Sequence, residues 1–99
     1  MLDKLKSMFE AQKKMKDVQN NLERLNVDYE GAKGRIKLKM NGTQKLLSVD
    51  IDESFLTPEM KQSLEKELLL SINSLQEKVQ RVAQQELKQV MGDFKIPGL

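Results

Sequence analysis

The side chains of this sequence that are best suited to binding chemistry are lysines, and they gather in two stretches of its first half. Residues 4–16 carry five lysines and one acid, and residues 33–45 carry five basic side chains and no acid. Clustered ammonium groups bind phosphates as point charges, so both stretches indicate a polyanion partner such as nucleic acid. The alternative is that these lysines only solvate a helix face and a strand face, since the net charge is just +2.

The residue types that are missing exclude several classes of enzyme. The chain has no Cys and no His, so it has no thiol nucleophile, no Ser-His pair and no zinc site of the usual ligands. Asp50, Asp52 and Glu53 are clustered, but they match no calcium loop, and no carboxylate pair has a partner for acid–base work. We therefore predict no enzyme activity, no metal, no cofactor and no small-molecule substrate.

Residues 3–25 have the periodicity of an amphipathic helix. Apolar side chains recur at steps of three and four, namely Met8, Ala11, Met15, Val18, Leu22 and Leu25. We expect Leu5 and Phe9 to widen this apolar stripe at its start. Basic side chains on the remaining surface would give the helix a cationic outer face. The candidate DNA-binding residues on this helix are Lys6, Lys13, Lys14, Lys16 and Arg24.

Residues 27–52 are predicted to form a small antiparallel sheet. Ile36, Leu38 and Met40 alternate with basic residues, which places them on opposite faces of a strand. The following pair, residues 41–42, is Asn-Gly, which predicts a type I′ hairpin turn with positive φ at both positions. The return strand would bury Leu47, Val49 and Ile51, and its acids could pair with the basic face, for example Asp50 with Lys37 or Lys39. That basic face supplies the secondary DNA-binding candidates, which are Arg35, Lys37 and Lys39.

Residues 58–91 are predicted to form one long second helix. Thr57 is a good N-cap, Pro58 is tolerated at the first helical position, and an apolar ladder continues to Val90. Gly92 would serve as the C-cap, and residues 93–99 are expected to form a loose tail.

The size and composition of the chain predict a single domain, residues 1–99, that forms a homodimer. Only 38% of residues are hydrophobic and four are aromatic, so a monomer would have a thin core, and pairing of helices between protomers would add buried surface. The sequence has no signal-like start and no apolar run long enough for a bilayer, so we expect a cytoplasmic protein that does not span a membrane.

The order of these motifs resembles the YbaB/EbfC family of bacterial nucleoid-associated proteins. The resemblance rests on the strand that leads into Asn41-Gly42, the return strand through Val49-Asp50-Ile51-Asp52, and Ile72-Asn73 in the second helix, and it covers nearly the whole chain. It implies an α+β fold with an α-β-β-β-α protomer and an intertwined homodimer whose two sheets join. On this resemblance we expect Asn73, on a helix that faces the sheet and the partner, to make a structural hydrogen bond; the alternative from the sequence alone is a solvated Asn in mid-helix.

The resemblance also implies that the protein binds double-stranded DNA with low sequence specificity and associates with the nucleoid. Organisation of the nucleoid and effects on gene expression would follow from such binding. Few arginines and no Trp argue against detailed base readout, so phosphate contacts are expected to dominate.

Two other functions fit parts of the sequence. The first is a helix–hairpin–helix interaction module or holdase, because Met-rich apolar seams adapt to many polypeptides. The second is binding to a membrane surface through the start of the first helix, where apolar residues alternate with Lys4 and Lys6. Between these and DNA binding, the resemblance favours DNA.

Overall fold

The protein folds into two long helices joined by a three-stranded antiparallel sheet, as seen in a computed structural model that describes residues 2–90. The order of elements is α1 (Leu2–Arg24), β1 (Asn26–Gly31), β2 (Ile36–Asn41), β3 (Leu46–Ile51) and α2 (Lys61–Val90). Three short 3₁₀ turns lie at Ala32–Gly34, Glu53–Phe55 and Pro58–Met60. The predicted α-β-β-β-α fold is confirmed, with element ends within a few residues of the predicted ones; the predicted tail and Gly92 cap lie outside the described residues.

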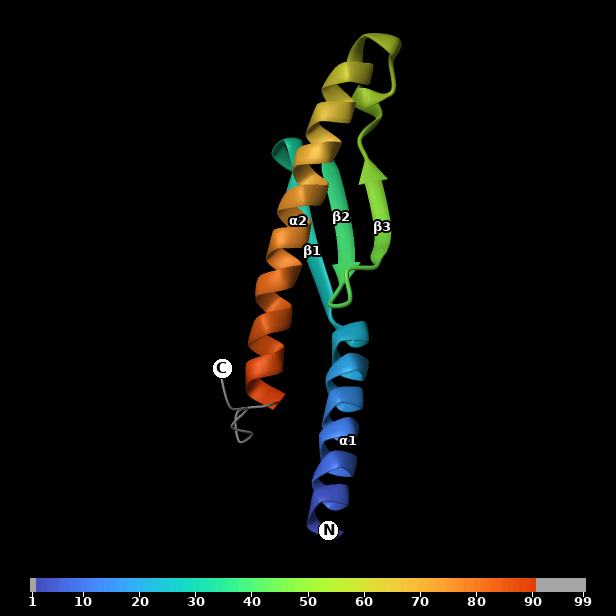
Figure 1. Cartoon of the computed structure of the whole chain (residues 1–99). Coiled ribbons are helices and arrows are strands. Elements are labelled where there is room, and N and C mark those ends of the chain that lie inside the picture. The colour runs from blue at the N-terminus through green and yellow to red at the C-terminus, as the bar shows by residue number, and fades with distance from the viewer. Residues whose placement is uncertain (1, 91–99) are drawn as a thin grey trace.

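The molecule is elongated because α1 continues past the end of the sheet. Figure 1 shows α1 extending from the lower end of the strands, while α2 runs back along the sheet toward the same end of the molecule. The principal extents are 68 × 22 × 16 Å. Much of α1 is therefore an arm that projects from the body rather than a helix packed on the core.

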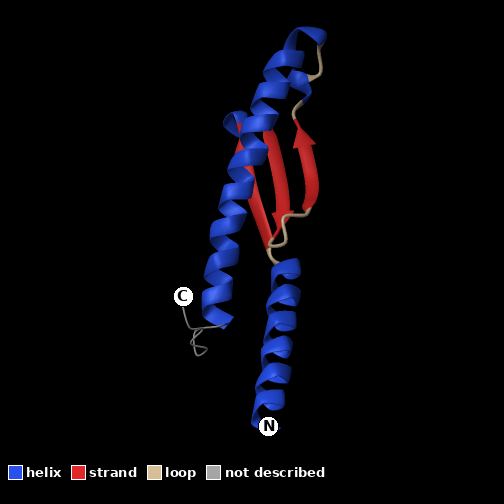
Figure 2. Cartoon of the chain, viewed as in Figure 1, coloured by secondary structure: helices blue, strands red, loops and turns tan. Residues whose placement is uncertain are grey.

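The core lies between α2 and one face of the sheet (Figure 2). Ile36 and Leu38 of β2 are almost fully buried against Leu75 and Val79 of α2, as the alternation of the strand and the helical spacing of the apolar ladder predicted. Burying side chains of this size stabilises the fold by about 1.5–3 kcal/mol each. Phe55, from the 3₁₀ turn after β3, completes this cluster with a 1% exposed ring.

Close contact between α2 and β1 depends on a small residue at each surface. A Cβ built on Gly31 would collide with the hydroxyl of Ser71, which is itself buried under the strand. Asn73, two residues later, is exposed and does not face the sheet, while its expected place against a partner protomer stays a prediction. Ser71 occupies the position where the helix approaches the sheet.

The sheet has the order β1-β2-β3, and β3 lacks the cover that the sequence pattern predicted. Leu47 and Val49 are 44% and 48% exposed, and only Ile51 is partly buried. Val49 pairs with buried Leu38 but lacks cover because α2 packs mainly against β1 and β2. For Leu47 there is a second cause: an irregularity pairs Met40 with Leu46, which leaves Leu47 out of the register. The prediction of a buried face on β3 is wrong for Leu47 and Val49.

The β2–β3 hairpin is confirmed, but its turn is not of type I′. The positive φ in this loop belongs to Gln44, at 68°, and not to Asn41 or Gly42. The Asn41 Oδ1 atom holds the loop by accepting hydrogen bonds from the Thr43 N–H (3.0 Å), the Thr43 hydroxyl (2.7 Å) and the Lys45 N–H (2.9 Å). Gly42 is required for a different reason: a Cβ there would lie 2.7 Å from the Leu22 carbonyl oxygen of α1.

Candidate nucleic-acid interface

The outward side of α1 carries exposed basic side chains. Val18 is the residue of α1 that is buried, with 4% exposure, and it marks the packed side of the helix. At 3.6 residues per turn, Lys13 and Lys16 point roughly away from Val18. The exposed basic candidates on this side of the helix are Lys6, Lys13, Lys16 and Arg24. The structure thus gathers four of the five helix candidates on one accessible surface, which we call the α1 outer face.

Lys14 differs from the other four candidates. It precedes Val18 by one helical turn and is half-buried, so it lies on the packed side of α1. A lysine in that position extends its aliphatic stem along neighbouring side chains. Lys14 is therefore less suited than Lys13 to reach a phosphate in front of the α1 outer face.

A stripe of acids borders the α1 outer face. Asp3, Glu10 and Asp17 recur every seven residues, which places them along one line of the helix, and all three are exposed. This line lies next to Lys6 and Lys13. The positive surface is consequently narrow, and a polyanion would approach it from the side opposite Val18.

Apolar side chains share the α1 outer face with the lysines. Phe9 is nine residues from Val18, so it points to the opposite side of the helix, and 68% of its surface is exposed. Leu2 and Leu5 are also exposed on the outward side. Leu5 and Phe9 therefore do not widen a packed stripe within the single chain, where Met8 and Met15 of the predicted stripe are exposed as well. Counting helical turns from Val18, rather than from Met8, would have predicted that Phe9 lies on the exposed side of the helix.

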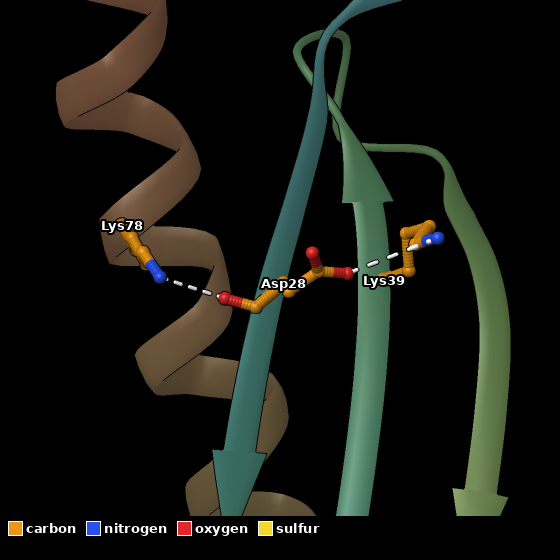
Figure 3. A network of polar contacts seen from close by, with 3 residues as sticks. All are labelled: Asp28, Lys39 and Lys78. Atoms are coloured by element: carbon orange, nitrogen blue, oxygen red, sulfur yellow. Dashed lines mark hydrogen bonds and ion pairs between the residues drawn. The ribbon is translucent and has the colours of Figure 1, made fainter.

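The strand candidates lie in a surface of mixed charge. The Lys39 Nζ atom lies 3.9 Å from an oxygen of the Asp28 carboxylate, and the Asp28 carbonyl oxygen accepts a 2.7 Å hydrogen bond from the Lys78 Nζ atom of α2 (Figure 3). Lys37 lies opposite Asp50 in β3, as predicted, and opposite Glu30 in β1. Acids on both neighbouring strands therefore offset the charge of the β2 lysines.

Arg35 is engaged in the fold. Its guanidinium carbon lies 4.4 Å from the centroid of the Phe55 ring, and its Nε–H donates a 3.1 Å hydrogen bond to the Ala32 carbonyl oxygen. Cation–π contacts of this kind contribute about 0.5–1 kcal/mol at exposed sites. A small pocket of about 110 Å³ beside Arg35 is also lined by Lys37, Asp50 and Asp52, which again mixes both charges.

Asp52 closes the end of β3. Its carboxylate accepts a 3.0 Å hydrogen bond from the Ser54 N–H, and hydrogen bonding to Ser54, with a smaller contribution from nearby Arg35, lowers the pKa of Asp52. Within residues 2–90, no three Asp or Glu side chains are grouped closely enough to hold a metal ion. In the same range, neither helix is long and apolar enough to cross a membrane.

Comparison with known proteins identifies the family. A family model described as the YbaB/EbfC DNA-binding family matches residues 1–94. Similar curated proteins include a nucleoid-associated protein of Chlorobium phaeobacteroides, 36% identical over 96% of this chain and 84% of the relative. Another, from Afipia carboxidovorans, is 30% identical over 99% of this chain and 93% of the relative.

The fold is also found in a solved structure. The crystal structure of an uncharacterized protein from Helicobacter pylori matches with a TM-score of 0.77, covering 92% of this chain and 97% of the other. The identity is 16%, so this match supports the fold alone. The family match over residues 1–94, together with relatives that are 36% and 30% identical, shows that the chain belongs to the YbaB/EbfC DNA-binding family.

Proposed function

We propose that this chain is a nucleoid-associated protein that binds double-stranded DNA through phosphate contacts, with low sequence specificity. Membership of a DNA-binding family and the names of similar proteins support the general function. The single observation that carries the mode of binding is the α1 outer face, where four basic side chains are exposed on an arm that projects past the sheet (Figure 1).

Electrostatics explains why such binding would be nonspecific. Lysine ammonium groups contact phosphates as point charges, and binding gains free energy as condensed counterions are released from the duplex. Three of the four exposed candidates are lysines, and Arg24 is the remaining one. Arginine has the planar fork suited to bidentate recognition, whereas lysine is a flexible point charge, so a mainly lysine surface favours contacts with the phosphate backbone over detailed reading of the bases.

The exposed edge of the sheet supports a homodimer. Leu46, Leu47 and Val49 on β3 are each 40–48% exposed, and β3 is an edge strand with unpaired backbone groups. Apolar residues on an open edge favour pairing with another strand. On the opposite edge, the Lys78 Nζ atom of α2 donates to the Asp28 carbonyl oxygen of β1, so that backbone group already has a partner. We propose that two copies join along β3.

A dimer would present two α1 arms to one duplex. Each arm is about 35 Å long at 1.5 Å per residue, which is close to one turn of B-DNA. Once one arm is bound, the second arm is held near the same duplex at a high effective concentration. The overall affinity for DNA therefore rises without any new contact residue. The proposal involves no catalysis, cofactor, small-molecule substrate or membrane, and it places the protein in the bacterial cytoplasm on the nucleoid.

The proposed function is tested by measuring duplex binding and mass together. Fluorescence anisotropy with three unrelated 30-base-pair duplexes, from 50 to 300 mM salt, should give similar Kd values for all three and affinity that falls steeply with salt. Light scattering should give twice the 11.4 kDa chain mass. Absence of salt-dependent binding would contradict the proposal, and suppression of a client protein's aggregation instead would favour the holdase alternative.

A further inference from the structure

We propose that Phe9 is an apolar wedge that enters the minor groove of duplex DNA between two lysines and bends the duplex. This inference rests on the proposed DNA binding and adds the part of the DNA that α1 contacts. The first observation is that Phe9 is 68% exposed and is absent from the hydrophobic core, so the described fold gives its ring no packing role.

The second observation is the position of Phe9 among the lysines. Lys6 precedes it by three residues and Lys13 follows it by four, and both are exposed. The corresponding rises along the helix axis are about 4.5 Å and 6 Å, so the two lysines straddle Phe9 over about 10.5 Å. The minor groove is about 6 Å wide. A helix lying across it would place one lysine near each phosphate backbone and the ring over the groove.

The third observation is that an aromatic ring in this setting has a known use in DNA binding. Proteins that bind the minor groove insert Phe, Leu, Ile or Met side chains between base steps and kink the duplex. The unstacking cost is offset by burying the apolar side chain and by the additional phosphate contacts that bending allows.

Charge disfavours the two other occupants of this surface. For a membrane, the apolar line is too short, because residues 13, 16 and 20 continue the outward side as Lys, Lys and Asn. For a second copy packed face to face, the lysines around Phe9 would meet the same lysines of the partner.

The test compares three variants on the full chain. Phe9→Ala removes the wedge, Phe9→Leu keeps an apolar wedge, and Met15→Ala is the control, because Met15 is an exposed apolar residue of α1 that lies on a different side of the helix. Circular dichroism should show that all three fold like the wild type. Anisotropy gives affinity, and end-to-end energy transfer on a 30-base-pair duplex gives the bend.

We expect Phe9→Ala to weaken binding about tenfold at every salt concentration, the size of one aromatic–base stacking interaction. The slope of log K against log salt should stay unchanged, because every phosphate remains neutralised by the same lysines. The bend and any preference for flexible TA steps should disappear, while Phe9→Leu retains most of the bend and Met15→Ala behaves like the wild type.

Three results would overturn the inference. If the wild type binds DNA and Phe9→Ala binds and bends it equally, Phe9 is no wedge, although the proposed function stands. If Phe9→Ala instead raises the dimer dissociation constant, or lowers binding to phosphatidylserine vesicles, with DNA binding unchanged, the face belongs to a second copy or to lipid. If the wild type itself binds no duplex, the proposed function fails together with the inference.

Discussion

The backbone N–H of Gly42 donates a 2.8 Å hydrogen bond to the carbonyl oxygen of Leu22, which joins the β2–β3 turn to the last turn of α1. The last carbonyls of a helix lack partners within the helix, so the hairpin turn satisfies one of them. The Leu25 N–H shares the same acceptor at 3.3 Å. This contact fixes where the arm leaves the sheet, and through it the direction of the α1 outer face.

Replacing Gly42 with alanine should therefore disturb the arm. The new Cβ would lie 2.7 Å from the Leu22 carbonyl oxygen and 3.0 Å from the Leu22 Cα, so backbone must shift. We expect Gly42→Ala to lower the free energy of unfolding by about 1–3 kcal/mol in urea denaturation, the usual cost of overpacking. Lys45→Ala, an exposed change in the same loop, is the control. Equal stability of the Gly42 variant and the wild type would show that the contact is loose.

A second prediction concerns the left-handed turn after β1. Ala32 and Lys33 have φ of 51° and 59°, a region that costs a residue with a Cβ about 1 kcal/mol or more. Lys33→Gly should therefore raise the free energy of unfolding by about 0.5–1 kcal/mol, after the added entropy of the unfolded chain is subtracted. Lys33→Ala loses the same charge but keeps the Cβ, so it should bring no such gain. If both variants are equally stable, charge rather than backbone strain is responsible.

The buried face of β2 gives a third prediction. Leu38 is 2% exposed and lies between its neighbours Tyr29 and Val49. Leu38→Asp would bury an unpaired carboxylate at a cost of roughly 3–5 kcal/mol, enough to unfold a chain of this size. Ser48→Asp introduces the same group at an exposed strand position and should stay folded. Circular dichroism distinguishes the two, and a folded Leu38→Asp protein would mean that the assigned strand faces are reversed.

Acid should weaken one local contact at the end of β3. Because hydrogen bonding to Ser54 lowers the pKa of folded Asp52, its charged form stabilises the fold above the unfolded pKa, and that contribution is lost as pH falls through the folded pKa. Asp52→Asn should therefore be less stable than the wild type at pH 7 and should approach it below about pH 4. Thermal melts at pH 7 and pH 3 measure this difference. A gap of equal size at both pH values would mean that the carboxylate charge has no part in it.

The local elements could be predicted from the sequence because their patterns have fixed periods. Ile36, Leu38 and Met40 alternate, and the apolar ladder of α2 leads to Leu75 and Val79, so each buried set faces the other. The exposure of Val49 could not be predicted in this way. Apolar and polar residues alternate in β3 as regularly as in β2. Whether a strand is covered, however, depends on where α2 crosses the sheet, and tertiary packing rather than the sequence period decides this.

In the candidate site, too, the features that depend on local periodicity could be predicted, and those that depend on tertiary contacts could not. Helical phase correctly placed Lys13 and Lys16 on an exposed surface, because angle along a helix follows from residue number alone. The pairing of Lys39 with Asp28 was missed, since it needed the register between β1 and β2, which no single strand encodes. The reason for Gly42 was also missed, because the close approach of Leu22 is a tertiary contact.

The most direct test of the account is the salt dependence of duplex binding in a charge variant of the α1 outer face. The variant replaces Lys6, Lys13 and Lys16 by Gln, all exposed positions where the fold should remain intact. The matched control makes the same change in charge on α2, at the exposed residues Lys66, Arg81 and Lys88.

We predict that the α1 variant binds all duplexes more weakly, and that the slope of log K against log salt falls by about 0.9 for each phosphate that is no longer neutralised. The α2 control should keep most of the wild-type slope. Wild-type affinity and slope in the α1 variant, together with loss of binding when Lys37 and Lys39 of β2 are replaced instead, would contradict the account and place the DNA on the open face of the sheet.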